Sequence, residues 1–501
     1  MAPFRGAKGY CAKRPMSAPK LNVTRLPVRL AADARRVIAR PFLPGGAGRI
    51  GAVIGRVLAL TDDEVSSMLS TVLSDYRTRH KDIRGIFRQN YAMAIAQPGV
   101  AAQAAPSDER RLLLGAYFTS EYSLESVALF NPSMVLHPDQ NGVPHGSARF
   151  IVSLRACGEG HISSIEFRTG LVDAGGAVTF DVPSAFALTA RPDDDALYDK
   201  ASYVPKLVEM KAHRQWAEPI LALLDSEFTM SDLRYAIERC RPQGTDTSFT
   251  ELADNMIWLA HSNYQLEFSP DLPLSARVIF PVSENESRGI EDARFVRFMH
   301  GDGRVCYYAT YTAYNGFRVL PQLIETADFR HFKINTLNGR CVQNKGMALF
   351  PRKIGSDFVM ASRLDGENIY LLRSDNVHFW NESKLIREPK YPWEFVQVGN
   401  CGSPIETKDG WLLLTHGVGP MRQYWIGALL LDLEDPSRVL GDLREPMLMP
   451  NADERDGYVP NVVYSCGAML HDDHLIVPYA ISDSYSSIAS VSLSELLSRL
   501  H

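Results

Sequence analysis

The sequence is poor in cysteine, has no long apolar run and carries no excess of one charge. Its 501 residues have seven scattered cysteines with no closely spaced pair, namely Cys11, Cys157, Cys240, Cys306, Cys341, Cys401 and Cys466. This odd, dispersed set predicts free thiols in a reducing compartment, hence a cytoplasmic chain without zinc or a disulfide framework. No apolar run reaches the roughly 18 residues of a transmembrane helix. The basic residues 1–20 lack the apolar stretch of a secretory signal, and they indicate a mobile tail. We therefore expect no membrane partner.

Charge and motifs exclude further classes. The formal net charge is −5, from 53 basic and 58 acidic residues, which argues against a nucleic-acid partner. The sequence lacks a nucleophile elbow of the GxSxG type, an HExxH zinc motif, a Walker loop and a dinucleotide-binding fingerprint after a strand. The common serine-hydrolase, zinc-protease and nucleotide-binding chemistries are therefore not expected.

Helical and strand patterns alternate along the chain. Residues 1–130 are expected to form a tail and a mostly helical region, with Thr61 to Glu64 capping a helix and residues 98–110 forming a surface loop. Residues 131–182 have the alternation of strands, including a pair around the turn at Gly158 to Gly160. Helical spacing returns in 183–265, and 266–501 is almost wholly strand and turn.

The C-terminal half repeats itself weakly. Residues 326–332 resemble residues 374–380, about 48 positions later, and each segment follows two hydrophobic strands and ends on an aromatic residue. Strand repeats of 40–50 residues are typical of propeller blades. Four such units fit into 283–495, and 131–182 supplies a first blade. We therefore predict a mainly β fold, a five-bladed β-propeller with an N-terminal helical region and a helical insertion at 183–265. A β-sandwich with helical additions is the alternative.

The densest polar cluster is residues 284–294, which precede an apolar strand. In a regular strand Asp292 and Arg294 would share one face and Glu291 the other. An arginine beside Asp292 favours the ionised carboxylate, whereas a proton donor needs a raised pKa. On composition alone, a solvated turn with a structural ion pair is the favoured interpretation.

Three later segments also carry polar groups at strand ends. They are Lys345 with Arg363, whose cations suit an anion such as phosphate; His416, after the apolar strand that begins at Trp411; and Asp483, after the strand 475–479. On its own, the segment with Lys345 and Arg363 is more typical of surface charge, and a histidine placed like His416 is equally often an ordinary turn residue. Dispersed acids, arginines and aromatic residues on a propeller fit carbohydrate chemistry best, because glycosidic cleavage needs one proton donor and one activated acceptor.

Several ordered motifs between about 283 and 490 resemble glycoside hydrolase family 130, the β-mannoside phosphorylases and related β-mannosidases. The motifs are Gly289-Ile290-Glu291-Asp292-Ala293-Arg294, Tyr311-Thr312-Ala313-Tyr314, Leu349-Phe350-Pro351-Arg352-Lys353-Ile354, Gly410-Trp411-Leu412-Leu413, His416-Gly417-Val418 and residues 428–436. Residues before 130 and the helical insertion resemble nothing in the family's core.

The resemblance implies a five-bladed propeller and an inverting reaction on a β-linked mannose. It implies Asp292 as the catalytic proton donor, acting through the 3-hydroxyl of the sugar. Asn131, Arg155, Arg294 and Asp483 match sugar-binding positions, and Lys345, Arg363 and His416 match phosphate-binding positions. Gln397 stands where the family's phosphorylases have a further lysine, which removes one cation from that site.

We therefore expect a phosphorylase that forms α-mannose 1-phosphate from an oligosaccharide, with inorganic phosphate as co-substrate and no metal or other cofactor. An inverting β-mannosidase is the nearest alternative, with Glu367 or Glu394 as the base that activates water. A non-catalytic carbohydrate-binding propeller is a third. The helical parts are candidates for contacts within a homo-oligomer.

Overall fold

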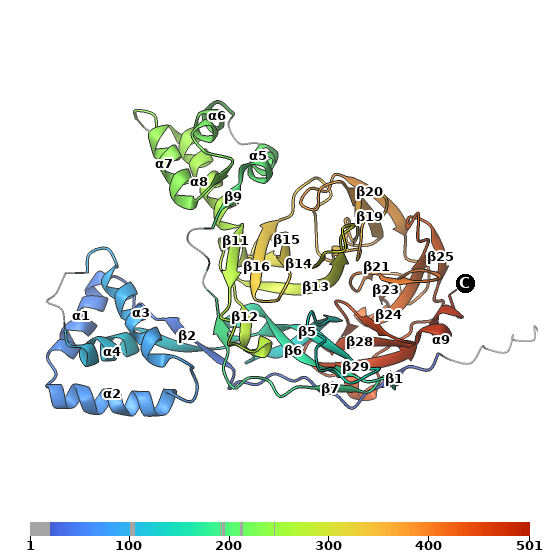
Figure 1. Ribbon diagram of the computed structural model, residues 1–501, viewed down its shortest axis with the longest axis horizontal. Coiled ribbons are helices and arrows are strands. Elements are labelled where there is room, and N and C mark those ends of the chain that lie inside the picture. Colours follow the sequence, from blue (N-terminus) through green and yellow to red (C-terminus); the bar gives the residue numbers. More distant parts are fainter. Residues whose placement is uncertain are drawn as a thin grey trace, which may run out of the picture.

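In this computed structural model, the structure describes residues 21–100, 106–190, 192, 196–210, 214–244 and 246–500. Strands dominate, and two groups of helices stand outside the strands (Figure 1). The expectation of a mainly β fold is confirmed. Cys11 and the basic residues 1–20 lie outside the described residues. No described helix combines the length and apolar character needed to cross a membrane.

The N-terminal helices are α1 (Ala47–Leu58), α2 (Asp62–Tyr76), α3 (Ile83–Ile95) and α4 (Asp108–Tyr117). The predicted cap of α2 is confirmed, because the Thr61 side chain accepts from the Glu64 backbone N–H while the Glu64 side chain accepts from that of Thr61. The predicted loop 98–110 is wrong at its end, since Ser107 caps α4 and the helix begins at Asp108. Ile54, Val57, Leu113 and Phe118 are part of a separate small core here.

Two strands, β2 (Val37–Pro41) and β3 (Thr119–Ser123), pair antiparallel between these helices and the main strand region. Beside them lies a buried ion-pair network. Arg36 Nη2 lies 2.6 Å from Glu166 Oε2 and its Nε 3.1 Å from Glu125 Oε1, and Arg168 contacts both glutamates. The network therefore links the N-terminal segment to the first strand unit.

The first strand unit contains β4 (Ala128–Leu136), β5 (Ala148–Cys157), β6 (Ser163–Val172) and β7 (Val178–Phe180). The predicted strand pair around Gly158 to Gly160 is confirmed by the β5–β6 ladder. The second unit contains β13 (Gly289–Met299), β14 (Val305–Tyr314), β15 (Val319–Thr326) and β16 (His331–Thr336), with β11 (Tyr264–Glu267) at its edge. A bridge between β13 and β6, together with β12 (Arg277–Ile279) and β8 (Leu188–Thr189), joins both units into one sheet.

Three further antiparallel units follow. They comprise β17 (Ala348–Leu349), β18 (Phe358–Ser362), β19 (Ile369–Ser374) and β20 (Glu382–Arg387); β21 (Gln397–Asn400), β22 (Ile405–Thr407), β23 (Gly410–Val418), β24 (Tyr424–Leu431) and β25 (Val439–Asp442); and β26 (Val463–Tyr464), β27 (Met469–His471), β28 (His474–Ile481) and β29 (Tyr485–Ser492). The N-terminal strand β1 (Thr24–Arg25) completes the last unit by pairing with β29, and α9 (Leu493–Leu497) follows it. The units succeed one another in a ring in Figure 1.

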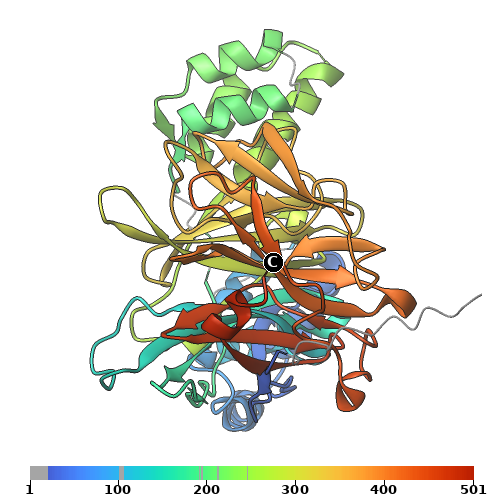
Figure 2. The ribbon, with the colours of Figure 1, turned by 90° about the vertical axis from the view of Figure 1, so that its right-hand side faces the viewer.

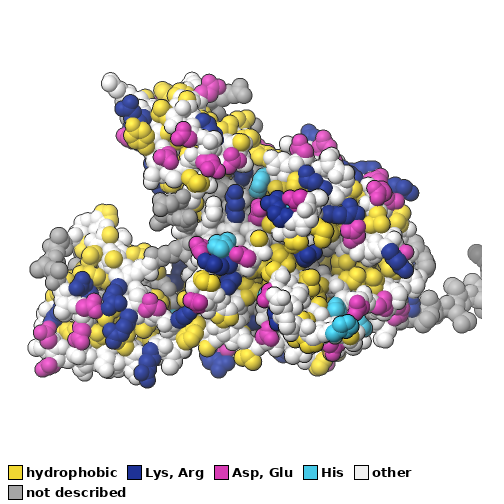
Figure 3. Space-filling model, viewed as in Figure 1, with side chains coloured by type: hydrophobic (Ala, Val, Ile, Leu, Met, Phe, Trp, Pro, Cys, Tyr) yellow, Lys and Arg dark blue, Asp and Glu magenta, His cyan; other side chains and the backbone are white. Residues whose placement is uncertain are grey.

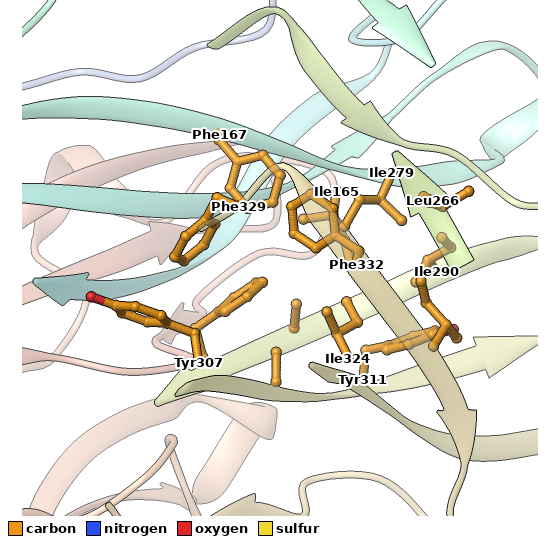
Figure 4. Close-up of a cluster of buried hydrophobic side chains, with 14 of the residues drawn as sticks. Ile165, Phe167, Leu266, Ile279, Ile290, Tyr307, Tyr311, Ile324, Phe329 and Phe332 are labelled. Carbon is orange, nitrogen blue, oxygen red and sulfur yellow. The ribbon is translucent and has the colours of Figure 1, made fainter. Parts of the chain in front are cut away.

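The two segments noted as a repeat occupy equivalent places. Thr326 ends β15 before β16, and Ser374 ends β19 before β20, so each segment is the turn between the third and fourth strands of its unit. The aromatic residues that end the two segments, Phe332 and Trp380, are buried. Phe329 packs with Phe167 and Phe332 in the core shared by the first two units (Figure 4).

The helical insertion contains α5 (Lys200–Glu209), α6 (Arg214–Ala222), α7 (Met230–Arg239) and α8 (Thr247–His261), with a short pair of β9 (Tyr198–Asp199) and β10 (Glu227–Phe228). It has its own apolar core, in which Leu207, Ile220, Phe249 and Met256 are buried. Figures 1 and 2 show it projecting beyond the strand units. The short 3₁₀ helices are η1 (Glu159–His161), η2 (Leu274–Ala276), η3 (Glu284–Glu286), η4 (Pro420–Arg422) and η5 (Ala452–Glu454).

Candidate active site

Three polar residues from distant parts of the chain sit at irregular points of their strands. Asn131 lies at a register shift in β4, Asp292 at one in β13, and Asp483 in the turn between β28 and β29. Their φ angles are 49°, 57° and 52°, in the left-handed region that Asn and Asp tolerate better than most residues. Strained backbone of this kind often occurs at functional sites, because it aims side chains where a regular strand would not.

Asp292 is the best-enclosed carboxylate of this group, with 9% of its surface exposed. Asn131 Nδ2 donates to Asp292 Oδ1 at 2.6 Å, and Arg155 Nη1 lies 3.5 Å from the same oxygen. The fold therefore brings together three of the predicted residues, from β4, β5 and β13.

The expected opposition of Glu291 and Asp292 is wrong. The register shift between Glu291 and Arg294 breaks the strand alternation, so both carboxylates reach the guanidinium of Arg155. Arg155 Nη2 donates to Glu291 Oε1 at 2.7 Å, and Lys345 Nζ forms an ion pair with the other Glu291 oxygen. Glu291 thus lies between two cations that the sequence assigned to different ligands.

Arg294 is buried and held away from the Asp292 carboxylate. Its Nη1 donates to the backbone oxygen of Asp292 at 2.8 Å, and its Nη2 donates to the Tyr464 hydroxyl at 2.7 Å. Its Nε has no hydrogen-bond partner among the described residues. The arginine beside Asp292 in sequence is therefore engaged elsewhere, and Arg155 is the cation that contacts the carboxylate.

Two carboxyl groups at the site have opposite pKa shifts. Burial on its own raises the pKa of Asp292, but Arg155, Arg294, Lys345 and the Asn131 hydrogen bond outweigh it, and the net pKa is lowered. For Asp483, burial and then the charge of Asp292 raise the pKa to about 6. Asp292 is therefore ionised at neutral pH in the free protein, and Asp483 titrates close to neutrality.

The predicted anion-binding residues also converge. Arg363 Nη1 donates to His416 Nε2 at 3.2 Å, and a Cβ added to Gly346, next to Lys345, would lie 3.8 Å from Arg363 Nε. Burial, followed by the charges of Arg363 and Arg294, lowers the pKa of His416 well below its ordinary value. The ring is neutral at pH 7, so the cluster offers two cations and a neutral imidazole to an anion.

Gly399 makes the close approach of these groups possible. A Cβ added at this position would lie 2.5 Å from His416 Cε1 and 2.7 Å from Arg363 Cδ. The buried Nε of Arg363 and Oδ1 of the neighbouring Asn400 have no hydrogen-bond partners among the described residues. Buried polar atoms of this kind are normally satisfied, so they are consistent with a polar ligand here.

A cavity of about 820 Å³ opens beside Arg155 and Glu291, and we call it the site cavity. Arg155, Glu291 and Asp483 line it, together with exposed aromatic residues such as Phe317 and Tyr458. Its volume lies within the usual range of small-molecule pockets. On the face of the protein seen in Figure 3, acidic and basic side chains are interspersed.

The two glutamates considered as bases for water differ in their surroundings. Glu394 is buried and accepts from Arg387 Nη2 at 2.9 Å and from the backbone N–H groups of Lys390 and Tyr391. These bonds hold its carboxylate in a structural ion pair. Glu367 is exposed.

Some contact residues were not foreseen. The role of Glu291 as the bridge between Arg155 and Lys345 depends on the bulge, which strand alternation conceals. Tyr464 and Asn400 lie beside unremarkable apolar and glycine-rich segments, so only the packing of different units brings them to Arg294 and Gly346.

Comparison with known proteins identifies relatives of the C-terminal half of the chain. Residues 272–501 match the family model described as beta-1,4-mannooligosaccharide phosphorylase. The 1,2-beta-oligomannan phosphorylase of Thermoanaerobacter sp. (strain X514) is 37% identical over 218 residues, which cover 43% of this chain and 72% of that protein. The beta-1,2-mannobiose phosphorylase of Listeria innocua serovar 6a is 31% identical over 229 residues, covering 44% and 63%. A solved structure of a Listeria innocua beta-1,2-mannobiose phosphorylase aligns with a TM-score of 0.45 at 22% identity, over 76% of this chain and 93% of that chain.

The chain is thus a glycoside-processing enzyme. It belongs to glycoside hydrolase family 130, the family of the β-mannoside phosphorylases. The family match contains six of the predicted site residues, whereas Asn131 and Arg155 precede it. The N-terminal helices and the helical insertion also lie outside the matched residues.

Proposed function

We propose that this enzyme cleaves a terminal β-linked mannose by phosphorolysis with inversion and releases α-mannose 1-phosphate. The observation that carries the proposal is that Lys345 pairs with Glu291, next to Asp292 in the chain, while Arg363 contacts His416 and lies close to Gly346, the neighbour of Lys345. A hydrolase needs no anion site of this kind, whereas a phosphorylase must hold phosphate against the anomeric carbon.

On the sugar side, Asn131, Arg155, Arg294 and Asp483 bind the terminal mannose. Asp292 gives its proton to the 3-hydroxyl of the sugar, which passes its own proton to the departing glycosidic oxygen. A phosphate oxygen forms the new bond to the anomeric carbon from the opposite face as the glycosidic bond breaks. One bond forms, one breaks and one proton moves to the leaving sugar, so metal and redox groups are not required.

The lowered pKa of Asp292 in the free protein leaves the question of how it becomes a proton donor. Bound phosphate resolves this, because its negative charge compensates Lys345, one of the cations that lower the pKa of Asp292. Phosphate binding thus raises the pKa of Asp292, so that this carboxyl group is protonated when the attacking phosphate is bound.

The five strand units act as blades of a propeller around this pocket. Their antiparallel order and their succession in the ring of Figure 1 support this architecture. Asp292 and Asp483 then come from different blades and meet at the centre.

The test is the rate of β-mannobiose cleavage with and without inorganic phosphate, in the wild type and in Arg363→Ala. We expect phosphate-dependent turnover, and a loss of at least about 100-fold in Arg363→Ala from removing one cation at the attacking group. Arg352→Ala is the matched control, because Arg352 pairs with Glu406 on the surface, and it should behave as the wild type. Equal rates with and without phosphate would show the hydrolase instead.

A β-mannosidase is the second candidate, because Gln397 supplies no third cation to the anion site. Glu394 is held by Arg387, so the exposed Glu367 is the remaining base for water. Glu367→Gln should abolish turnover in a hydrolase and leave a phosphorylase unchanged.

A further inference from the structure

A second depression adjoins the site cavity on the side of the helical insertion, and we call it the insertion groove. It has a volume of about 740 Å³ and is lined by Asp254, Trp258 and His261 of α8, Glu284 of η3, and Asn315 and Phe317 of the β14–β15 loop, among others. Asn315 and Phe317 also line the site cavity. The two depressions therefore meet at this loop.

The walls of the insertion groove are fixed to one another. Buried Asn285 donates through Nδ2 to Ser262 Oγ at 2.7 Å, which joins η3 to the end of α8. Directly after α8 the chain enters β11, which pairs with β16 over four residues. The helix that carries Trp258 is therefore anchored to the second strand unit beside the site cavity.

The side chains of the groove suit a neutral, hydroxyl-rich chain. Trp258 is half-buried, and Phe317 is 95% exposed at the ridge between the two depressions. Flat aromatic surfaces pack against the C–H faces of sugar rings while polar neighbours bind hydroxyl groups. The surrounding charges are of both signs, with Asp254 and Glu284 opposed by Arg318, so the groove does not select a strongly charged ligand.

We propose that the insertion groove binds the distal sugar units of a β-mannooligosaccharide whose terminal mannose occupies the Asp292 site. This inference rests on the proposed function. Asp292 is 9% exposed and lies beside Arg155, which lines the site cavity, so the rest of the substrate extends through this cavity past Phe317, which borders it. Trp258 and Phe317 hold successive sugar rings, and the helical insertion makes the enzyme prefer long substrates.

The test compares kcat/KM for phosphorolysis of mannobiose and mannopentaose, each with β-1,2 and β-1,4 linkages. The wild type should prefer the pentaose of the accepted linkage. Trp258→Ala and Phe317→Ala should each lose about tenfold or more on the pentaose and less than about twofold on the biose. Phe317 is a safe second variant because its exposed side chain has little role in folding. Tyr235→Ala is the matched control, since Tyr235 is a 65% exposed aromatic residue of the same insertion outside the groove lining.

Equal kcat/KM for biose and pentaose, or groove variants that match Tyr235→Ala, would overturn the inference. Calorimetric titration with mannopentaose separates it from the proposed function. If the wild type cleaves neither mannobiose nor mannopentaose but binds the pentaose in a Trp258-dependent manner, the groove proposal is supported and the phosphorolysis proposal fails. If mannobiose is phosphorolysed but Trp258 affects neither binding nor rate on the pentaose, the groove proposal alone fails.

Discussion

At the scale of single residues, the site depends on backbone conformations that few residue types adopt. Asn131, Asp292 and Asp483 all have positive φ angles, and each uses this to leave the line of its strand. Asn and Asp therefore both tolerate this backbone conformation and present a polar side chain. The sequence signalled Asp292 through its motif, but the φ angle that places it beside Glu291 at Arg155 cannot be inferred from strand periodicity.

The pKa of Asp483 predicts a pH effect on stability. An aspartate whose pKa rises to about 6 on folding favours the folded state when protonated, so its contribution falls as pH rises from about 4 to above 6. Asp483→Asn removes this loss and should make the protein more stable than the wild type by about 1–3 kcal/mol at pH 7. Urea unfolding of both proteins at pH 4.5 and pH 7 measures it. The same difference in stability between the two proteins at pH 4.5 and at pH 7 would contradict the raised pKa of Asp483.

Gly399 tests the geometry of the anion cluster. An added methyl group would press on His416 and Arg363, so Gly399→Ala should raise the KM for phosphate about tenfold or more, with a smaller change in the KM for the sugar. Gly301→Ala is the control, because an added Cβ there meets nothing within 4 Å. Equal changes in both KM values would indicate general disruption instead of a displaced phosphate site.

At the scale of elements, the sequence predicted local structure correctly where a few neighbouring residues determine it. The Thr61 cap and the β5–β6 pair follow from side-chain chemistry and alternation within a few residues. Helix α1 was not foreseen, because its three glycines, Gly48, Gly51 and Gly55, are typical of loops. Its stability comes from packing Ile50, Ile54 and Val57 into the N-terminal core, which local propensity does not reveal.

The buried network of Arg36 ties β2 to the first strand unit and gives a stability prediction. Arg36→Ala leaves Glu125 and Glu166 buried without one of their two arginines, which should cost about 3–5 kcal/mol of unfolding free energy. Arg35→Ala is the neighbouring control, since Arg35 is 86% exposed and pairs only with Asp33 among the described contacts, and it should cost less than about 1 kcal/mol. Chemical denaturation measures both. Equal costs would show that burial does not govern this network.

At the scale of the whole molecule, the repeated segments that end at Phe332 and Trp380 led to the prediction of five strand units. The polar motifs allowed the candidate site to be listed before its geometry was known. Their meeting could not be derived, because it depends on contacts between Asn131 and Asp292, 161 residues apart, and between Arg294 and Tyr464, 170 residues apart. The insertion groove could not be foreseen either, since it exists only where α8 lies against the β14–β15 loop.

The most direct test of the account is ³¹P and ¹H NMR of β-mannobiose and inorganic phosphate incubated with the wild type and with Asp292→Asn. The account predicts that the wild type produces α-mannose 1-phosphate as its first product. Asp292→Asn, which should unfold at the same midpoint as the wild type, should produce none. Free mannose formed at the same rate without phosphate, or undiminished product from Asp292→Asn, would contradict it.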